Sequence, residues 1–160
     1  MAESVINRRQ VLRGAGVAAG GAAVGALAFA PAASAHDTGE RGPSGSWLVV
    51  RQDDGDPVRT TLVLSFGGGG IFISHDINPA GPPFTGTWEA DGQRFRATFW
   101  TGQGGNGPNQ PAITIRVRLR GRVNGESLTG TYTVTVFDSA TGTPIQTVTG
   151  KVLSGHPIEA

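Results

Sequence analysis

The strongest constraint on the fold is an alternating pattern on either side of Asn124-Gly125. In the segments 112–123 and 126–137, apolar and polar side chains alternate with the two-residue period of a half-buried β-strand. Asn-Gly is a preferred pair for a two-residue type I′ turn, because both positions of that turn need positive φ. We therefore predict that these segments form a β-hairpin with one apolar face.

A two-residue turn at Asn124-Gly125 also predicts which residues face each other. Pairing outward from the turn sets Gly121 opposite Leu128 and Val117 opposite Tyr132. All the apolar residues then share one face. A slip by one residue would bury the arginines of the other face, so the face that each residue occupies is strongly specified.

Asp91-Gly92 predicts a second hairpin of the same kind. Pairing outward from this turn sets Trp88 opposite Phe95 and Phe84 opposite Phe99. Aromatic residues are therefore expected to gather on the apolar face of this hairpin as well.

The region that follows residue 45 is predicted to be all-β. Eight strand candidates follow one another at regular spacing, at 46–52, 59–66, 70–76, 84–90, 93–101, 112–123, 126–137 and 143–153. Tight turns alternate along the chain with longer loops, so the two kinds of connection are expected at opposite ends of the sheet. A sheet of this size with one apolar face leaves two exposed edges unless it closes. We therefore expect an eight-stranded up-and-down antiparallel barrel over residues 46–160, with a sandwich of two sheets as the alternative.

The N-terminal segment resembles a bacterial twin-arginine export signal. Arg8 and Arg9 lie in the motif Asn-Arg-Arg-Gln-Val-Leu-Arg, and a mildly apolar stretch covers residues 14–30. Ala33 and Ala35 then form an A-x-A cleavage site. The resemblance implies that the twin-arginine translocase exports a folded protein and that the chain is secreted.

Cleavage after this site would divide the chain into a signal peptide over 1–35, a flexible lead-in over 36–45 and a single barrel domain. The alternative for residues 14–30 is a membrane anchor. That stretch is shorter than the roughly 20 apolar residues of a membrane span, and it contains several glycines. We therefore expect no stable membrane span after cleavage.

The composition excludes several kinds of function. Removal of residues 1–35 takes away three of the 13 basic residues and one of the 12 acidic ones, so the remaining chain is near neutral and is not expected to bind nucleic acid generally. The chain has no cysteine, which excludes disulfides, thiolate catalysis and zinc–cysteine sites.

Gly45-Ser46-Trp47, at the start of the first predicted strand, resembles the G-x-W motif of the lipocalin and avidin group of small β-barrels (calycins). Gly86-Thr87-Trp88 offers a second copy. The resemblance implies a closed barrel end near Trp47 and an interior site for a small ligand. The size and strand count are also similar to those of the allene oxide cyclase-like barrels, so the resemblance implies either a carrier or an enzyme.

Inward-facing residues are the candidates for a ligand site in such a barrel. Trp88, Phe95 and Phe99 would supply apolar walls, and Tyr132 and Gln146 would supply polar contacts. Small residues at inward positions would leave room for a ligand, namely Gly86, Ala97, Gly121, Gly130 and Gly150. The alternatives are that these glycines allow the strands to bend and that Tyr132 bonds a backbone group or a water molecule in a filled core.

His75 is the one candidate for catalysis, because none of the familiar catalytic motifs is present. If Phe66 pairs with Ile71 across the glycine turn, Leu62 pairs with His75 and the imidazole joins the inner face. It could then act as an acid or a base near neutral pH. The alternative is a rim histidine bonded to a loop carbonyl.

No metal or cofactor site is expected. The histidines show no three-ligand spacing. The acidic loop that contains Asp53, Asp54 and Asp56 is interpreted as a polar turn, because it lacks a glutamate at the spacing that a calcium loop requires.

A stripe of arginines marks the opposite face of the first hairpin, at Arg116, Arg118, Arg120 and Arg122. One interpretation is a solvated outer face on which arginine stems cover threonines. The other is contact with an anionic polymer of the cell envelope, or a subunit interface.

Three functions are consistent with these features, and an exported barrel that binds a small apolar ligand is the preferred one. The second is a cyclase or isomerase that acts without covalent catalysis. The third is an envelope or interaction protein whose barrel is a packed scaffold. The sequence leaves enzymatic activity and oligomeric state open.

The export signal generates a direct prediction. Changing both Arg8 and Arg9 to Lys should abolish export, because a twin-arginine signal depends on this pair. N-terminal sequencing of the protein exported from wild-type cells should give His36 as the first residue. Recovery of an exported chain that still begins before residue 31 would contradict the cleavage site.

Overall fold

The computed structural model describes residues 42–107 and 110–159, which form a closed barrel of eight antiparallel strands in chain order. Each strand begins within one residue of its predicted start, and the predicted all-β, up-and-down barrel is confirmed. The strands are β1 (Gly45–Asp53), β2 (Arg59–Phe66), β3 (Ile71–Asn78), β4 (Phe84–Asp91), β5 (Arg94–Gln103), β6 (Ile113–Asn124), β7 (Ser127–Asp138) and β8 (Pro144–Pro157).

The predicted signal peptide, with Arg8, Arg9, Ala33 and Ala35, lies outside the described residues. Within the described part of the chain, no helix has the length and apolar character needed to cross a membrane.

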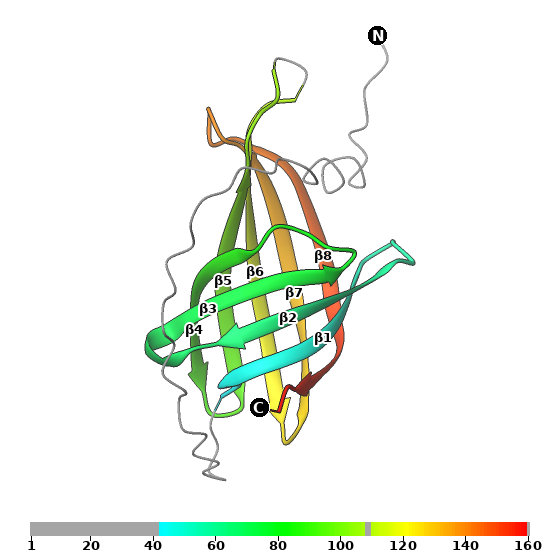
Figure 1. The fold of residues 1–160 in the computed structure, drawn as a ribbon, viewed down its shortest axis with the longest axis vertical. Helices are drawn as coiled ribbons and strands as arrows, with labels where there is room; N and C mark the ends of the chain where they lie inside the picture. Colours follow the sequence, from blue (N-terminus) through cyan, green and yellow to red (C-terminus); the bar gives the residue numbers. More distant parts are fainter. Residues whose placement is uncertain (1–41, 108–109, 160) are drawn as a thin grey trace. The chain divides into compact units, whose positions relative to one another are not determined.

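The connections gather at two ends of the barrel. The turn end carries the short 3₁₀ segment Gly68–Gly70 and the tight connections β4–β5 and β6–β7. The loop end carries the connections β1–β2, β3–β4, β5–β6 and β7–β8. Figure 1 shows that β1 to β3 cross the long strands β5 to β8 at a steep angle, whereas β4 bends to run beside β5. The strands β5 to β8 continue past β1 to β3 at the loop end.

The barrel closes where the first strand pairs with the last, from Trp47 opposite Pro157 to Asp53 opposite Gly150. This closure excludes the two-sheet sandwich and leaves neither β1 nor β8 as a free edge. Near the turn end, Trp47 is buried and its indole N–H donates to the carbonyl of buried Pro43 at 3.0 Å. The packed part of the chain therefore includes residues from the predicted lead-in.

The alternating pattern produces the expected two faces. Val117 and Leu119 are buried, whereas Arg118 and Arg120 are exposed. The inner face forms one apolar core, made by Trp47, Val49, Leu62, Leu64, Phe66, Phe72, Phe84, Phe95, Ala97, Phe99, Ile115, Val117, Leu119, Val123, Leu128, Tyr132 and Val152.

The predicted register at Asn124-Gly125 is wrong by two residues. Asn124 stays in β6 and pairs with Ser127, so Gly125 and Glu126 make the turn and Gly121 faces Gly130. Gly125 occupies the first turn position with a positive φ of 58°, which a glycine adopts without strain. The faces are unchanged, because a shift of two residues preserves the alternation.

The hairpin of β4 and β5 repeats this displacement. Asp91 pairs with Arg94, and Gly92 has φ of 56° at the first turn position. Trp88 therefore faces Ala97 rather than Phe95. In both hairpins the residue before the glycine ends a strand and does not enter the turn.

The inner glycines do not leave empty space, contrary to expectation. A Cβ on Gly86 would lie 2.5 Å from the Cα of Phe99, and one on Gly121 would lie 2.6 Å from Cε1 of Phe95. A Cβ on Gly130 would lie 2.5 Å from the carbonyl oxygen of Arg120. These glycines allow rings and neighbouring backbone to approach closely.

The alternation predicts opposite outcomes for neighbouring positions of β6. Val117→Asp should lower the free energy of unfolding by about 3 kcal/mol or more, because it buries an unpaired carboxylate. Arg118→Asp should change it by about 0.5 kcal/mol or less, because the side chain lies in solvent. Urea unfolding of both variants measures the difference, and equal destabilisation would contradict the assigned faces.

Candidate functional site

A cluster of charged and polar side chains lies at the loop end of the barrel. Nη2 of Arg51 donates to Oδ2 of Asp76 at 2.8 Å, and Nη1 lies 3.2 Å from Oδ1 of Asp53. The hydroxyl of Tyr132 donates to the same oxygen of Asp53 at 2.6 Å. Nη1 of Arg51 also donates to this hydroxyl at 3.4 Å, with the guanidinium 5.5 Å from the centre of the tyrosine ring. These four side chains are called the loop-end cluster below.

Barrel closure brings the members of this cluster together. Tyr132 on β7 lies opposite Gly150 on β8, and Gly150 lies opposite Asp53 on β1. A Cβ at position 150 would overlap the Tyr132 hydroxyl. The absence of a side chain at Gly150 therefore leaves the space that the end of the Tyr132 side chain occupies. Asp76 comes from β3, two strands beyond β1, and completes a network that spans the junction between the first and last strands.

An extra residue in β8 adjusts the strands beside the cluster. The pairing of β1 with β8 shifts between Val50 and Arg51, so Leu153 is an extra, exposed residue between Val152 and Ser154. Because of this extra residue, a β-bulge, the strand keeps its inward and outward alternation on each side of Leu153, but the two alternating patterns are out of step with each other. Val152 and Gly155 are therefore both buried, although they are three residues apart.

The cluster is mostly withdrawn from solvent. The exposed fractions of the side chains are 14% for Arg51, 11% for Asp53 and 10% for Asp76. Burial by itself lowers the pKa of Arg51, but the Asp76 carboxylate and the Tyr132 hydroxyl outweigh it, so this pKa is raised above its ordinary value. The guanidinium is therefore a permanent cation beside two carboxylates.

Apolar residues of the inner face lie at the same end of the barrel. Ile113, Val134 and Val136 pack against the core but are only partly buried. They come from the long strands β6 and β7, which continue beyond β1 to β3 (Figure 1). The loop end therefore combines accessible apolar surface with a buried ionic cluster.

His75 does not lie on the inner face, and its predicted placement is wrong. Phe66 pairs with Phe72 rather than with Ile71, so His75 faces Val63 and its side chain is exposed. The 3₁₀ segment lengthens the connection by one residue, and a shift of one residue exchanges the faces of a strand. Asp76 takes the inner position in its place.

The other predicted ligand residues occupy different depths of the barrel. Phe95 and Phe99 are buried, and Phe95 packs edge-to-face on Phe66. Trp88 is half-buried near the turn end, where its indole N–H donates to the carbonyl of Gly67 at 2.9 Å. The three aromatic residues are part of the packed core or lie directly on it.

Tyr132 and Gln146 are both at inner positions, as predicted. Tyr132 is buried, and its hydroxyl donates to the Asp53 carboxylate at 2.6 Å. Gln146 lies opposite Val136 and is exposed at the loop end.

Arg51 is the functional candidate that the sequence analysis missed. It continues the inward alternation of Trp47 and Val49, which is a signal that could have revealed it. An arginine at an inward position needs a carboxylate partner. The search for that partner would have led to Asp53 and Asp76.

Among residues 42–107 and 110–159, no group of three or more histidine, aspartate and glutamate side chains could hold a metal ion. Comparison of the chain with protein-family models, with curated proteins and with solved structures finds no match.

Gly150→Ala tests whether Tyr132 depends on the missing side chain beside it. The new methyl group would overlap the tyrosine hydroxyl and lie 2.6 Å from the carbonyl oxygen of Gln52. We expect a loss of about 1–3 kcal/mol in the free energy of unfolding, as is typical of overpacking, and a changed near-ultraviolet circular dichroism signal from the single tyrosine of the chain.

Gly102→Ala is the matched control, because the nearest atom to its new Cβ would be the Ile113 carbonyl oxygen at 3.8 Å. This variant should keep both the stability and the spectrum of the wild type. Equal effects of the two substitutions would contradict the packing of Tyr132 over Gly150.

Proposed function

We propose that the barrel binds a small, mainly apolar molecule at its loop end, and that this molecule carries a hydroxyl or amino group. The observation that carries the proposal is the loop-end cluster itself. A buried ionic network contributes little to stability. When such a network lies beside accessible apolar surface, it is a candidate for a functional site.

The charges of the cluster favour a hydrogen-bond donor on the ligand. Arg51 bridges the carboxylates of Asp53 and Asp76, so acceptor oxygens predominate in the cluster. Arg51 bonds Oδ2 of Asp76, and within the described residues no donor bonds its Oδ1. Carboxylate oxygens accept hydrogen bonds and do not donate them. A hydroxyl or ammonium group therefore suits this position better than an anion.

The apolar part of the ligand would lie against Ile113, Val134 and Val136. These side chains belong to the inner face but are only partly covered by the protein. Each further Å² of their apolar surface that a ligand covers contributes roughly 25 cal/mol. The turn end offers less room, because rings and backbone occupy the space around Gly86 and Gly121.

The hydrogen bond from Tyr132 to Asp53 gives some support to a second function. A phenol and two carboxylates beside an apolar surface are groups that could move a proton on a bound substrate. The barrel would then be a cyclase or isomerase that acts without a covalent intermediate. Turnover that depends on the Tyr132 hydroxyl would distinguish this enzyme from a carrier.

Two probes that differ only in their polar end test the proposal. A dansyl fluorophore on an alkylamine should bind with roughly micromolar affinity, which corresponds to about 8 kcal/mol. The same fluorophore on an alkyl carboxylate should bind at least tenfold more weakly, because it meets the carboxylates of Asp53 and Asp76. Dansyl fluorescence titration measures both affinities.

Val136→Lys and Thr147→Lys form a matched pair for the same titration. Val136 lies on the inner face, whereas Thr147 is exposed one strand away on the outer face. The first variant should abolish binding of the amine probe and the second should leave it unchanged, with thermal unfolding used to verify that both fold. Uptake of neither probe by the wild type, or equal losses in the two variants, would contradict the loop-end site.

A further inference from the structure

The outer face of β5 to β8 has an unusual charge distribution. The two strands β5 and β6 carry six arginines, and β8 adds Lys151. The only carboxylate in the four strands is Asp138, at the last residue of β7. Most of the positive charge of the barrel therefore lies on one side of it.

Arginines face each other directly across the β5–β6 pair. Arg94 lies opposite Arg122, and Arg96 lies opposite Arg120. Like charges in directly opposed positions destabilise a sheet. An arrangement of this kind is relieved when an anion lies between the two guanidinium groups.

The protein itself neutralises this face only in part. Arg96 pairs with Glu89, and Arg122 donates to the amide oxygen of Gln93 at 2.6 Å. Within the described residues, Arg94, Arg118 and Arg120 have no ion pair or side-chain hydrogen bond.

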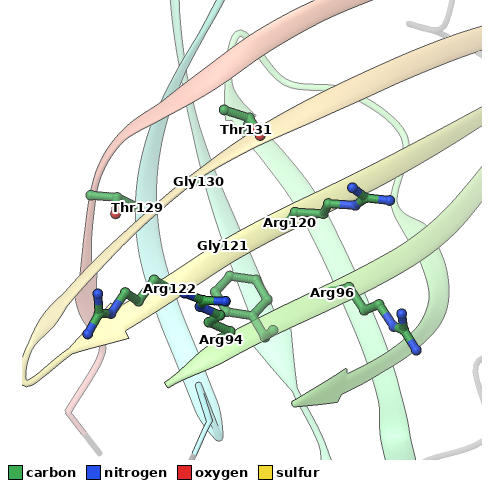
Figure 2. Close-up of a pocket in the computed structure, with 9 residues that line it drawn as sticks. Arg94, Arg96, Arg120, Gly121, Arg122, Thr129, Gly130 and Thr131 are labelled. Carbon is green, nitrogen blue, oxygen red and sulfur yellow. The ribbon is translucent and has the colours of Figure 1, made fainter. Parts of the chain in front are cut away.

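The arginines border two neighbouring depressions of the surface, which share lining residues and are together called the groove below. The first, shown in Figure 2, has Arg94, Arg96, Arg120 and Arg122 around Gly121 and Gly130, with Thr129 and Thr131 beside them. The second continues over β6, β7 and β8, and its lining includes Arg116, Arg118, Thr133 and Lys151. One carboxylate, that of Asp54, lies at its border and accepts a hydrogen bond from the Thr149 hydroxyl at 2.6 Å. Arg120 and Thr131 line both depressions. From Arg116 to Arg122 the groove follows β6 for about 20 Å, given the rise per residue of a strand.

We propose that this groove binds a linear phosphodiester polymer of the bacterial envelope, with its phosphates held between the opposed arginines and the threonine hydroxyls. A phosphate group offers several oxygens at different angles, so two guanidinium forks can bind it from opposite sides. Outward side chains repeat along a strand about every 6.8 Å. A polymer whose phosphates are separated by a short polyol matches that repeat with successive phosphates.

The surroundings of the groove disfavour single-stranded nucleic acid as the occupant. Nucleic acid would need exposed aromatic faces on which its bases stack. Trp100, which is 41% exposed, and Phe137 lie beside Arg116, whose guanidinium is 5.4 Å and 4.9 Å from the centres of their rings. Neither aromatic residue lines the groove. The export signal predicted in the sequence would also bring the chain to the envelope, where phosphodiester polymers are found.

Binding of the full chain to poly(glycerol phosphate) tests this proposal, with the dissociation constant measured by calorimetry at several salt concentrations. Arg120→Gln should weaken binding at least fivefold and reduce the salt dependence of the affinity. Arg120→Lys should weaken it less, because it keeps the charge and loses the bidentate geometry. Arg59→Gln removes the same charge from an exposed position on β2 and should change the affinity less than twofold.

Three results would overturn the proposal. The first is an Arg59→Gln variant that is weakened as much as Arg120→Gln, because the groove would then have no special role. The second is single-stranded DNA with the same number of phosphates binding as tightly as the polymer. The third is a polyuronate of equal charge binding as tightly, because carboxylates would then replace phosphates.

Discussion

The pairing of β1 with β8 is the contact on which the rest of the structure depends. It converts an eight-stranded sheet with two free edges into a barrel with none, and it thereby separates an inside from an outside. The same contact places Arg51 beside Tyr132, although 81 residues separate them in the chain. Closure lets the apolar side chains of every strand bury one another inside the barrel. An open sheet with the same alternation would leave its apolar face exposed or would need a second layer to cover it.

Inside the closed barrel, packing differs between the two ends. Toward the turn end, Phe66 contacts Phe72, Trp88 and Phe95 in edge-to-face arrangements. Inner glycines such as Gly121 let these rings reach close to the strands. Toward the loop end, the long strands extend beyond the short ones. The inner face there consists of half-buried aliphatic side chains and the loop-end cluster, in place of buried aromatic rings. The filled end can therefore hold the fold together while the other end binds a ligand.

The strands and their faces could be predicted from the sequence, because period-two alternation and Asx-Gly turns are local signals. The exact partners were not predicted at either Asx-Gly turn, because Asn124 and Asp91 remain in their strands and displace each turn by one residue. This displacement moved each residue's cross-strand partner by two positions, so the prediction of which side chains face inward stayed correct. At the glycine turn before β3 the shift was one residue, which exchanged His75 for Asp76 on the inner face.

The loop-end cluster was beyond local reasoning for a different reason. Its members come from β1, β3 and β7, and only the closed topology makes them neighbours. Tyr132 was identified because it lies in the best-defined hairpin. Arg51 was missed because its inward position becomes significant only when acidic partners are found on other strands.

The segregation of arginines on β5 to β8 has an electrostatic consequence for the whole molecule. The formal net charge of the chain is only +1 at pH 7, so attraction to a charged surface at long range is weak. The separation of charge nevertheless gives the barrel a dipole moment, whose field is screened over about 8 Å at physiological ionic strength. Such a molecule diffuses almost as a neutral particle until it is close to a polyanion. Within that distance the polyanion attracts the arginine side of the barrel more than the other sides, which favours one orientation during the approach.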